Sequence, residues 1–152
     1  MALLNILKEG DPTLGKISRP VTEIGDRIKT LLDDMAETMH RAEGVGLAAP
    51  QVGVLRRIVV IEVEPGNLIE LINPEIIERS GEQTGPEGCL SVPGKQGTVT
   101  RPSYVKVRAL DRNGELKEYE GRDLLARCFC HEIDHLDGIL YTSLATDIEY
   151  LE

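Results

Sequence analysis

The sequence has few aromatic residues and few cysteines. Its 152 residues include no tryptophan, one phenylalanine and four tyrosines, so we expect an aliphatic core and no surface that stacks aromatic side chains on nucleic-acid bases. The three cysteines, Cys89, Cys128 and Cys130, are an odd number, and no secretion signal precedes them. They therefore argue against a disulfide framework and favour a metal-binding or catalytic thiol.

Long hydrophobic runs and an excess of basic residues are also missing. No apolar run approaches the roughly 18 residues of a membrane span, and the N-terminal residues resemble neither a secretory signal nor a transit peptide. The 17 basic and 26 acidic residues leave a formal charge of −9, which argues against nucleic acid or an anionic membrane as a partner. We expect a cytoplasmic protein, although a mature organelle protein would share these features.

In other respects the composition is that of a globular protein. Apolar residues make up 41% and charged residues 28%, which excludes the disordered and fibrous classes. The length suits one hydrophobic core, and no segment has the composition of a linker. We predict a single domain over residues 1–152.

Hydrophobic periodicity predicts two helices. Over residues 26–41 apolar side chains recur at the spacing of one helical face, with Asp26 as the N-cap and Gly44 as the stop. The second predicted helix covers residues 124–137 and follows Asp123 as its cap.

Short strands are predicted between these helices, because β-branched runs and alternating residues surround turn signals such as Asn113-Gly114. The expected strands cover residues 58–63, 68–72, 76–79, 104–110 and 115–120. Residues 1–24 are expected to be extended or irregular, and residues 44–53 an ordered loop. Residues 80–97 are rich in glycine, with a short strand segment of small residues expected at 87–91. This order predicts an α+β fold, with mostly antiparallel strands around a central C-terminal helix and one N-terminal helix.

The segment His131-Glu132-Ile133-Asp134-His135 lies within the predicted C-terminal helix. Residues four apart stand above one another on a helix, so both imidazoles can share one metal ion. Glu132 is about 100° further round the helix, where its carboxylate can act as a general base for water beside that ion. The alternative is an amphipathic helix with two surface histidines. His40, alone near the end of the first helix, is interpreted as a solvated residue.

A catalytic metal site needs a third ligand, and the cysteines compete for this position. Cys130 points away from His131 by one helical step. Cys128 lies on the ligand face, but three ligands on one straight helix cannot easily surround an ion. Cys89 lies in a segment of small residues that can approach an ion closely, or it is a buried apolar thiol.

Three segments together resemble the peptide deformylases. They are Gly44-Val45-Gly46-Leu47-Ala48-Ala49-Pro50-Gln51, Glu87-Gly88-Cys89-Leu90-Ser91 and His131-Glu132-Ile133-Asp134-His135-Leu136. The resemblance implies a hydrolase that removes the formyl group from the N-terminal formyl-methionine of new polypeptides. It implies Cys89, His131 and His135 as metal ligands. The expected ion is Fe(II), with zinc, nickel or cobalt accepted instead, and a thiolate with two imidazoles suits these metals.

The resemblance also implies roles for residues around the ion. Glu132 is the expected general base, and the Gln51 amide and the Leu90 backbone N–H are expected to stabilise negative charge on the formyl oxygen. Gln51 could instead cap a turn. Because Gly44 and Gly46 allow a positive φ or a close approach, we expect a peptide strand alongside this loop, with Val45 and Gly46 in contact with substrate. The pocket for the methionine side chain is expected to include Leu124, Arg127 and Cys128.

The chain departs from the family pattern at three places. Cys130 replaces a usual glutamine, and we expect this change to affect only the support of the site. Arg127 replaces an apolar residue, and we expect its stem along the pocket and its guanidinium in water. The chain also lacks the long C-terminal helix of common bacterial members, like organelle-type and phage-encoded forms. This difference argues against docking on the ribosome by the tail. The expected partners are formyl-methionyl nascent peptides and, transiently, the ribosome.

Two other functions compete with this one. A zinc peptidase shares the His-Glu-x-x-His pattern but usually takes its third ligand downstream, where only 17 residues follow His135. The rival outside the enzymes is a structural metal module or a peptide-binding module. A structural metal site would be closed by four ligands, with Cys128 as the fourth. Removal of Glu132 separates an enzyme from such a module.

Overall fold

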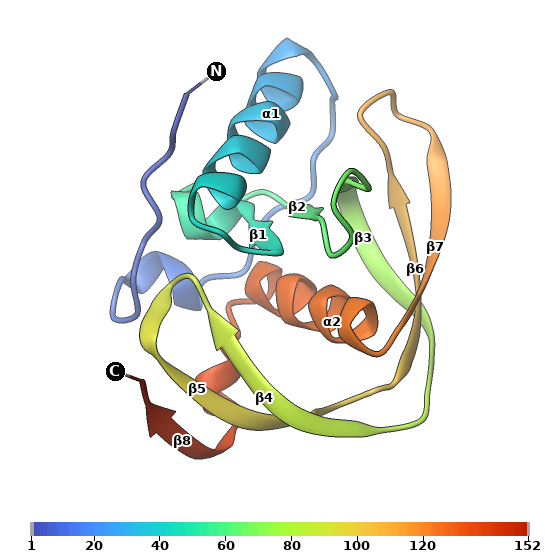
Figure 1. Cartoon of the computed structure of the whole chain (residues 1–152). Coiled ribbons are helices and arrows are strands. Elements are labelled where there is room, and N and C mark those ends of the chain that lie inside the picture. The colour runs from blue at the N-terminus through green and yellow to red at the C-terminus, as the bar shows by residue number, and fades with distance from the viewer. Residues whose placement is uncertain (1, 152) are drawn as a thin grey trace.

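The computed structural model describes residues 2–151 (Figure 1). Its α-helices are α1 (Asp26–Arg41) and α2 (Leu124–Leu136). The strands are β1 (Gly46–Ala48), β2 (Ile58–Ile61), β3 (Ile69–Ser80), β4 (Gln83–Cys89), β5 (Val92–Arg101), β6 (Tyr104–Leu110), β7 (Leu116–Arg122) and β8 (Thr146–Tyr150). Short 3-10 helices are η1 (Pro12–Gly15), η2 (Ala49–Val52) and η3 (Tyr141–Ser143). The predicted α+β class is confirmed.

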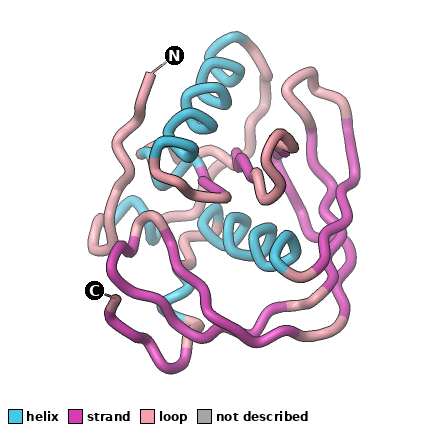
Figure 2. The backbone as a smooth tube through the Cα atoms, in the orientation of Figure 1, coloured by secondary structure: helices cyan, strands magenta, loops and turns pink. Residues whose placement is uncertain are grey.

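The strands form two antiparallel sheets with α2 between them. One sheet has the order β1-β2-β3-β6-β7 and the other the order β4-β5-β8. Figure 2 shows the strands passing around α2, while α1 lies outside on the β1–β2 side. Because β1 and β4 end their sheets, each has one edge that is not paired within its sheet.

The apolar stripe of α1 packs on β1 and β2. Leu32, Met35 and Met39 are completely buried there, as the predicted stripe requires. The N-cap position is occupied by Gly25 and not by Asp26, which is the first helical residue. The helix ends at Arg41, and the residue with positive φ beyond it is Glu43.

Helix α2 is buried along most of its length because sheets cover it on both sides. Its apolar residues Ala126, Phe129, Ile133 and Leu136 form one core with the inward side chains of β2, β3 and β6. Asp123 stands at the N-cap position, but its side chain makes no capping bond. None of the helices described is both long and apolar enough to cross a membrane.

One strand replaces the two strands predicted over 68–72 and 76–79. Asn73 has a φ of +52°, and the β3–β6 register shifts between Ile72 and Glu75. The Asn73 side chain accepts from Val21 N (2.8 Å) and donates to Val21 O (2.9 Å). The Asn-Pro pair therefore makes a bulge that holds the N-terminal segment, and the strand continues.

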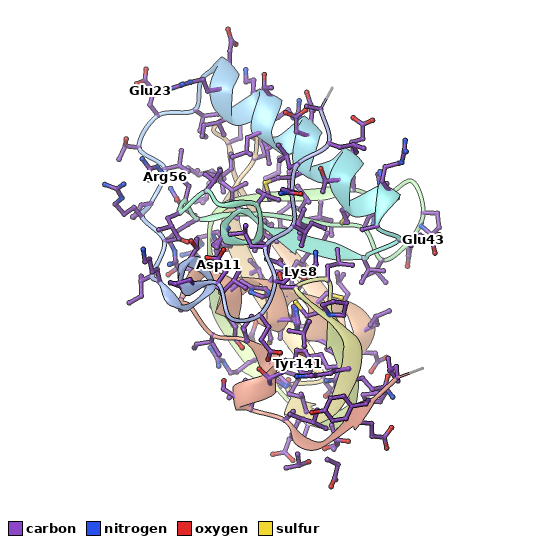
Figure 3. All side chains as sticks on the ribbon, turned by 90° about the vertical axis from the view of Figure 1, so that its left-hand side faces the viewer. Lys8, Asp11, Glu23, Glu43, Arg56 and Tyr141 are labelled. Carbon is purple, nitrogen blue, oxygen red and sulfur yellow. The ribbon has the colours of Figure 1, made fainter. Side chains whose placement is uncertain are left out.

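The glycine-rich residues 80–97 form most of a hairpin of β4 and β5, and the strand segment expected at 87–91 belongs to β4 up to Cys89. Residues 146–150, for which the hydrophobic periodicity predicts no strand, pair with β5 as β8. Before β8, Tyr141 points inward and is almost fully buried, whereas Glu23 and Glu43 lie at the periphery (Figure 3).

Candidate metal centre

Two elements bring the candidate ligands together. Helix α2 places His131 and His135 one turn apart, with ring centroids separated by 5.0 Å. Cys89, the last residue of β4, lies beside them, with its Sγ 3.3 Å from His135 Nε2. One ligand atom from each residue lies within 4.8 Å of the others. This group contains neither Cys128 nor Cys130, both of which are buried elsewhere on α2.

Glu87 orients the first histidine. Its Oε2 is 2.6 Å from His131 Nδ1, which leaves Nε2 as the nitrogen available on the side of the cysteine. Burial alone would raise the pKa of Glu87, but hydrogen bonds from His131 and Arg101 outweigh it and lower this pKa to about 2. Glu87 is therefore an ionised carboxylate that fixes the His131 ring.

Two arginines hold this buried carboxylate. Arg101 donates to both Glu87 oxygens, at 3.1 and 2.6 Å, and to Asp134 at 2.7 Å. Arg127 donates to Glu87 Oε1 at 2.8 Å. Sequence reasoning missed the role of Glu87 and Arg101. A signal was present, because Glu87 opens the same short segment that contains Cys89, although the β4–β5 register shifts between the two residues.

Glu132 is buried next to the candidate ligands. Burial raises its pKa to about 7, although His131 opposes the shift. Its Oε1 has no hydrogen-bond partner among the residues described. Gly46 passes so close that a Cβ there would lie 2.9 Å from Glu132 Cδ. The structure thus gives Gly46 a close approach to a side chain. The alternative expectation of a positive φ at Gly44 and Gly46 is wrong.

His135 is suited to act as a neutral ligand. Burial, together with repulsion from His131, lowers its pKa to about 3. Its Nδ1 is buried without a partner within residues 2–151. Tyr141 stacks on the other histidine, His131, with ring centroids 6.1 Å apart.

Gln51 is buried at the end of the first predicted motif. Its Oε1 accepts from Ala48 N at 2.9 Å, so the expected turn-capping role is present. Its Nε2 donates to Ser91 Oγ at 3.0 Å and approaches Cys89 Sγ at 3.5 Å. The amide N–H groups are therefore directed towards the cysteine.

A cavity of about 420 Å³ opens beside this group. Figure 1 shows α2 between β1 and β4, and residues of all three elements line the cavity. The sequence-predicted site residues in its lining are Val45, Gly46, Gln51, Cys89, Leu90, Leu124, Arg127, Cys128, His131 and Glu132. His135 lies deeper, with an exposed fraction of 1%.

Two other expectations concern side chains near α2. The expected solvation of the Arg127 guanidinium is wrong, because this residue is 7% exposed and Nη1 also donates to Val99 O at 3.1 Å. The buried Glu87 carboxylate supplies the partner that makes this burial possible. His40 lies on the surface, 3.1 Å from Glu62, as expected.

Comparisons with known proteins agree on one family. The family model described as polypeptide deformylase matches residues 3–150. The peptide deformylase of Agathobacter rectalis is 64% identical over 141 residues, covering 93% of this chain and 89% of that protein. That of Caldanaerobacter subterraneus is 63% identical, covering 93% and 88%. A crystal structure of the Legionella pneumophila peptide deformylase aligns with a TM-score of 0.93 and 45% identity, covering 96% and 88%.

Proposed function

The chain belongs to the peptide deformylase family of hydrolases, and we propose that it removes the formyl group from N-terminal formyl-methionine using one divalent metal ion. The observation that carries this proposal is the Cys89, His131 and His135 group beside Glu132 and the open cavity. The proposed setting is the cytoplasm, with formyl-methionyl nascent chains as substrates and transient contact with the ribosome.

The donor set fits such an ion. One sulfur and two nitrogens suit Fe(II), Co, Ni or Zn, and do not suit Mg or Ca. The buried His135 nitrogen is held neutral, and the Glu87 carboxylate leaves only one His131 nitrogen free. We propose Fe(II) as the ion in the cell, as the family resemblance implies. When bound, the ion supplies Lewis-acid chemistry, since it polarises the formyl carbonyl and acidifies nearby water.

Glu132 is the proposed general base. Its buried carboxylate lies beside the candidate ligands, with Oε1 unpartnered among the described residues, where it can accept a proton from the attacking water and return it to the leaving amine. One Gln51 Nε2 hydrogen is proposed to stabilise the negative charge on the formyl oxygen, together with the Leu90 backbone N–H. The Gln51 amide is held by hydrogen bonds to Ala48 and Ser91 before substrate binds, which lowers the cost of reorganisation.

The peptide is proposed to lie between the edge strands β1 and β4. Unpaired edges accept an extended chain by main-chain hydrogen bonds, and Val45 and Gly46 line the cavity on the β1 side. The methionine side chain is then proposed to enter the part of the cavity lined by Leu124, Arg127 and Cys128. We name this part the side-chain subsite.

The geometry favours an enzyme over a structural metal module. A module closed by four ligands requires Cys128, but this thiol lies outside the ligand group.

The test is an assay of anaerobically purified protein on formyl-Met-Ala-Ser, with metal analysis of the same sample. Glu132→Gln is expected to retain metal and lose about 10²-fold or more in turnover, since an amide cannot accept the proton. The control is Glu82→Gln, an exposed position outside the cavity, which is expected to behave as wild type. Near-normal turnover of Glu132→Gln would remove Glu132 from the mechanism.

A further inference from the structure

Arg127 forms part of the wall of the side-chain subsite, where two hydrogen bonds hold its guanidinium. Its Nη1 donates to Glu87 Oε1 and to Val99 O. The residue is 7% exposed and lines the cavity beside Leu124 and Cys128. A charged donor group therefore stands in a pocket whose other two α2 residues are apolar.

Part of this guanidinium has no acceptor. An arginine carries five N–H donors, and the described residues give partners only to Nη1. Nε and Nη2 are not completely buried. Both atoms therefore keep some accessible surface. Because Arg127 lines the cavity, an acceptor can reach these donors from the cavity.

The surrounding charges favour an uncharged acceptor. Arg101 and Arg127 balance the carboxylates of Glu87 and Asp134, which all belong to one connected cluster. A carboxylate entering the subsite would approach the carboxylates of Glu87 and Glu132, which line the cavity together with Arg127. A dipolar oxygen needs only a hydrogen-bond donor.

We propose that the side-chain subsite accepts oxidised methionine, so that the chain deformylates peptides that begin with formyl-methionine sulfoxide. The sulfoxide oxygen is a neutral acceptor placed on the sulfur of an otherwise unchanged side chain, and Arg127 donates to it. This inference rests on the proposed function. Water is consumed, the formyl C–N bond breaks, formate and the free amine are released, and the sulfoxide is unchanged.

The experiment compares two substrates within each protein. Wild type, Arg127→Leu and Arg127→Gln are assayed on formyl-Met-Ala-Ser and on its sulfoxide form, and the ratio of the two kcat/KM values is taken. The ratio cancels differences in metal content or in the fraction of folded protein. Formyl-norleucine-Ala-Ser, which lacks sulfur and oxygen, is the matched apolar substrate.

We expect Arg127→Leu to lower the sulfoxide-to-methionine ratio by about tenfold or more, the effect of one hydrogen bond from a charged donor. Arg127→Gln keeps N–H donors and is expected to lie between the two. The norleucine-to-methionine ratio is expected to stay within about twofold, because no oxygen is involved. A sulfoxide ratio that is equal in the three proteins overturns the proposal and leaves Arg127 only as a partner of Glu87.

A binding measurement covers the case in which the variants do not fold. In wild-type protein the ¹⁵N–¹H signal of the Arg127 side chain is followed while the product Met(O)-Ala-Ser or Met-Ala-Ser is added. A shift with the sulfoxide product alone supports the proposal, and equal shifts or none overturn it. If wild type cleaves neither formyl peptide, the proposed function itself fails. Cleavage of formyl-Met-Ala-Ser with an unchanged ratio refutes only the role of Arg127.

Discussion

Gly46→Ala tests whether the close approach of β1 to Glu132 is what places this carboxylate. The φ of Gly46 is not positive, so alanine can adopt its backbone conformation. The new Cβ would nevertheless lie 2.9 Å from Glu132 Cδ and 3.0 Å from Cγ, where ordinary contacts begin at 3.4 Å. Since α2 is packed between the sheets, the Glu132 side chain must move by several tenths of an ångström.

Two effects of Gly46→Ala can be given magnitudes. Overpacking of a buried site costs about 1–3 kcal/mol of unfolding free energy, and a misplaced catalytic group can cost up to about 10²-fold in rate. We expect a lower melting temperature and a lower kcat/KM on formyl-Met-Ala-Ser, with metal content unchanged. Gly15→Ala is the matched control, because its Cβ meets nothing within 4 Å.

A second substitution separates the contact from other causes. Glu132→Asp shortens the side chain by one methylene, so the double variant is expected to unfold at a higher temperature than Gly46→Ala alone. Wild-type activity and melting temperature in Gly46→Ala would refute the reasoning.

Three further predictions follow from the surroundings of the ligands. Cys89→Ala should lose metal and activity together, whereas Cys128→Ser should keep most of its metal, and full metal retention by Cys89→Ala would contradict the ligand set. Arg101→Leu should lower the unfolding free energy, measured in urea, by about 3–5 kcal/mol, because the Glu87 carboxylate stays buried without this partner. Arg108→Leu, which breaks the exposed pair with Glu118, should lower it by less than about 1 kcal/mol. Equal losses in the two variants would contradict this prediction. Burial raises the pKa of the Cys128 thiol to about 12. At pH 8 this thiol should therefore stay protonated and resist iodoacetamide until urea unfolds the protein. Rapid labelling of Cys128 in the folded protein would contradict this prediction.

Local patterns were sufficient for the helices. The bounds predicted for α1 and for β6 agree with the structure, because their periodicity runs over many consecutive residues. The extent and pairing of the β4–β5 hairpin could not be predicted in this way, although a strand segment was expected at 87–91. Its glycines and prolines are typical of loops, and its pairing with β8 joins residues about fifty positions apart in the chain, such as Gln96 and Glu149.

The candidate site likewise has one part that local patterns predict and another part that they do not. The histidine pair was predictable because its spacing is a property of one helix. The choice between Cys89 and Cys128 depends on where a strand 42 residues before His131 ends, which helix geometry does not determine. Only the resemblance to a family distinguished them, and the structure then places Cys89 Sγ 3.3 Å from His135 Nε2.

Arg127 shows how a correct physical rule led to a wrong expectation. An arginine cannot be buried without a partner, and the residues adjacent to Arg127 on α2 offer no carboxylate directed at it. The partner is Glu87, forty positions earlier in the chain. Glu87 is itself buried because it fixes His131, and a buried carboxylate needs cations and donors around it. The burial of Arg127 therefore follows from the burial of Glu87 beside the candidate ligand His131, and the same rule that predicted exposure explains why this arginine lies inside the cavity wall.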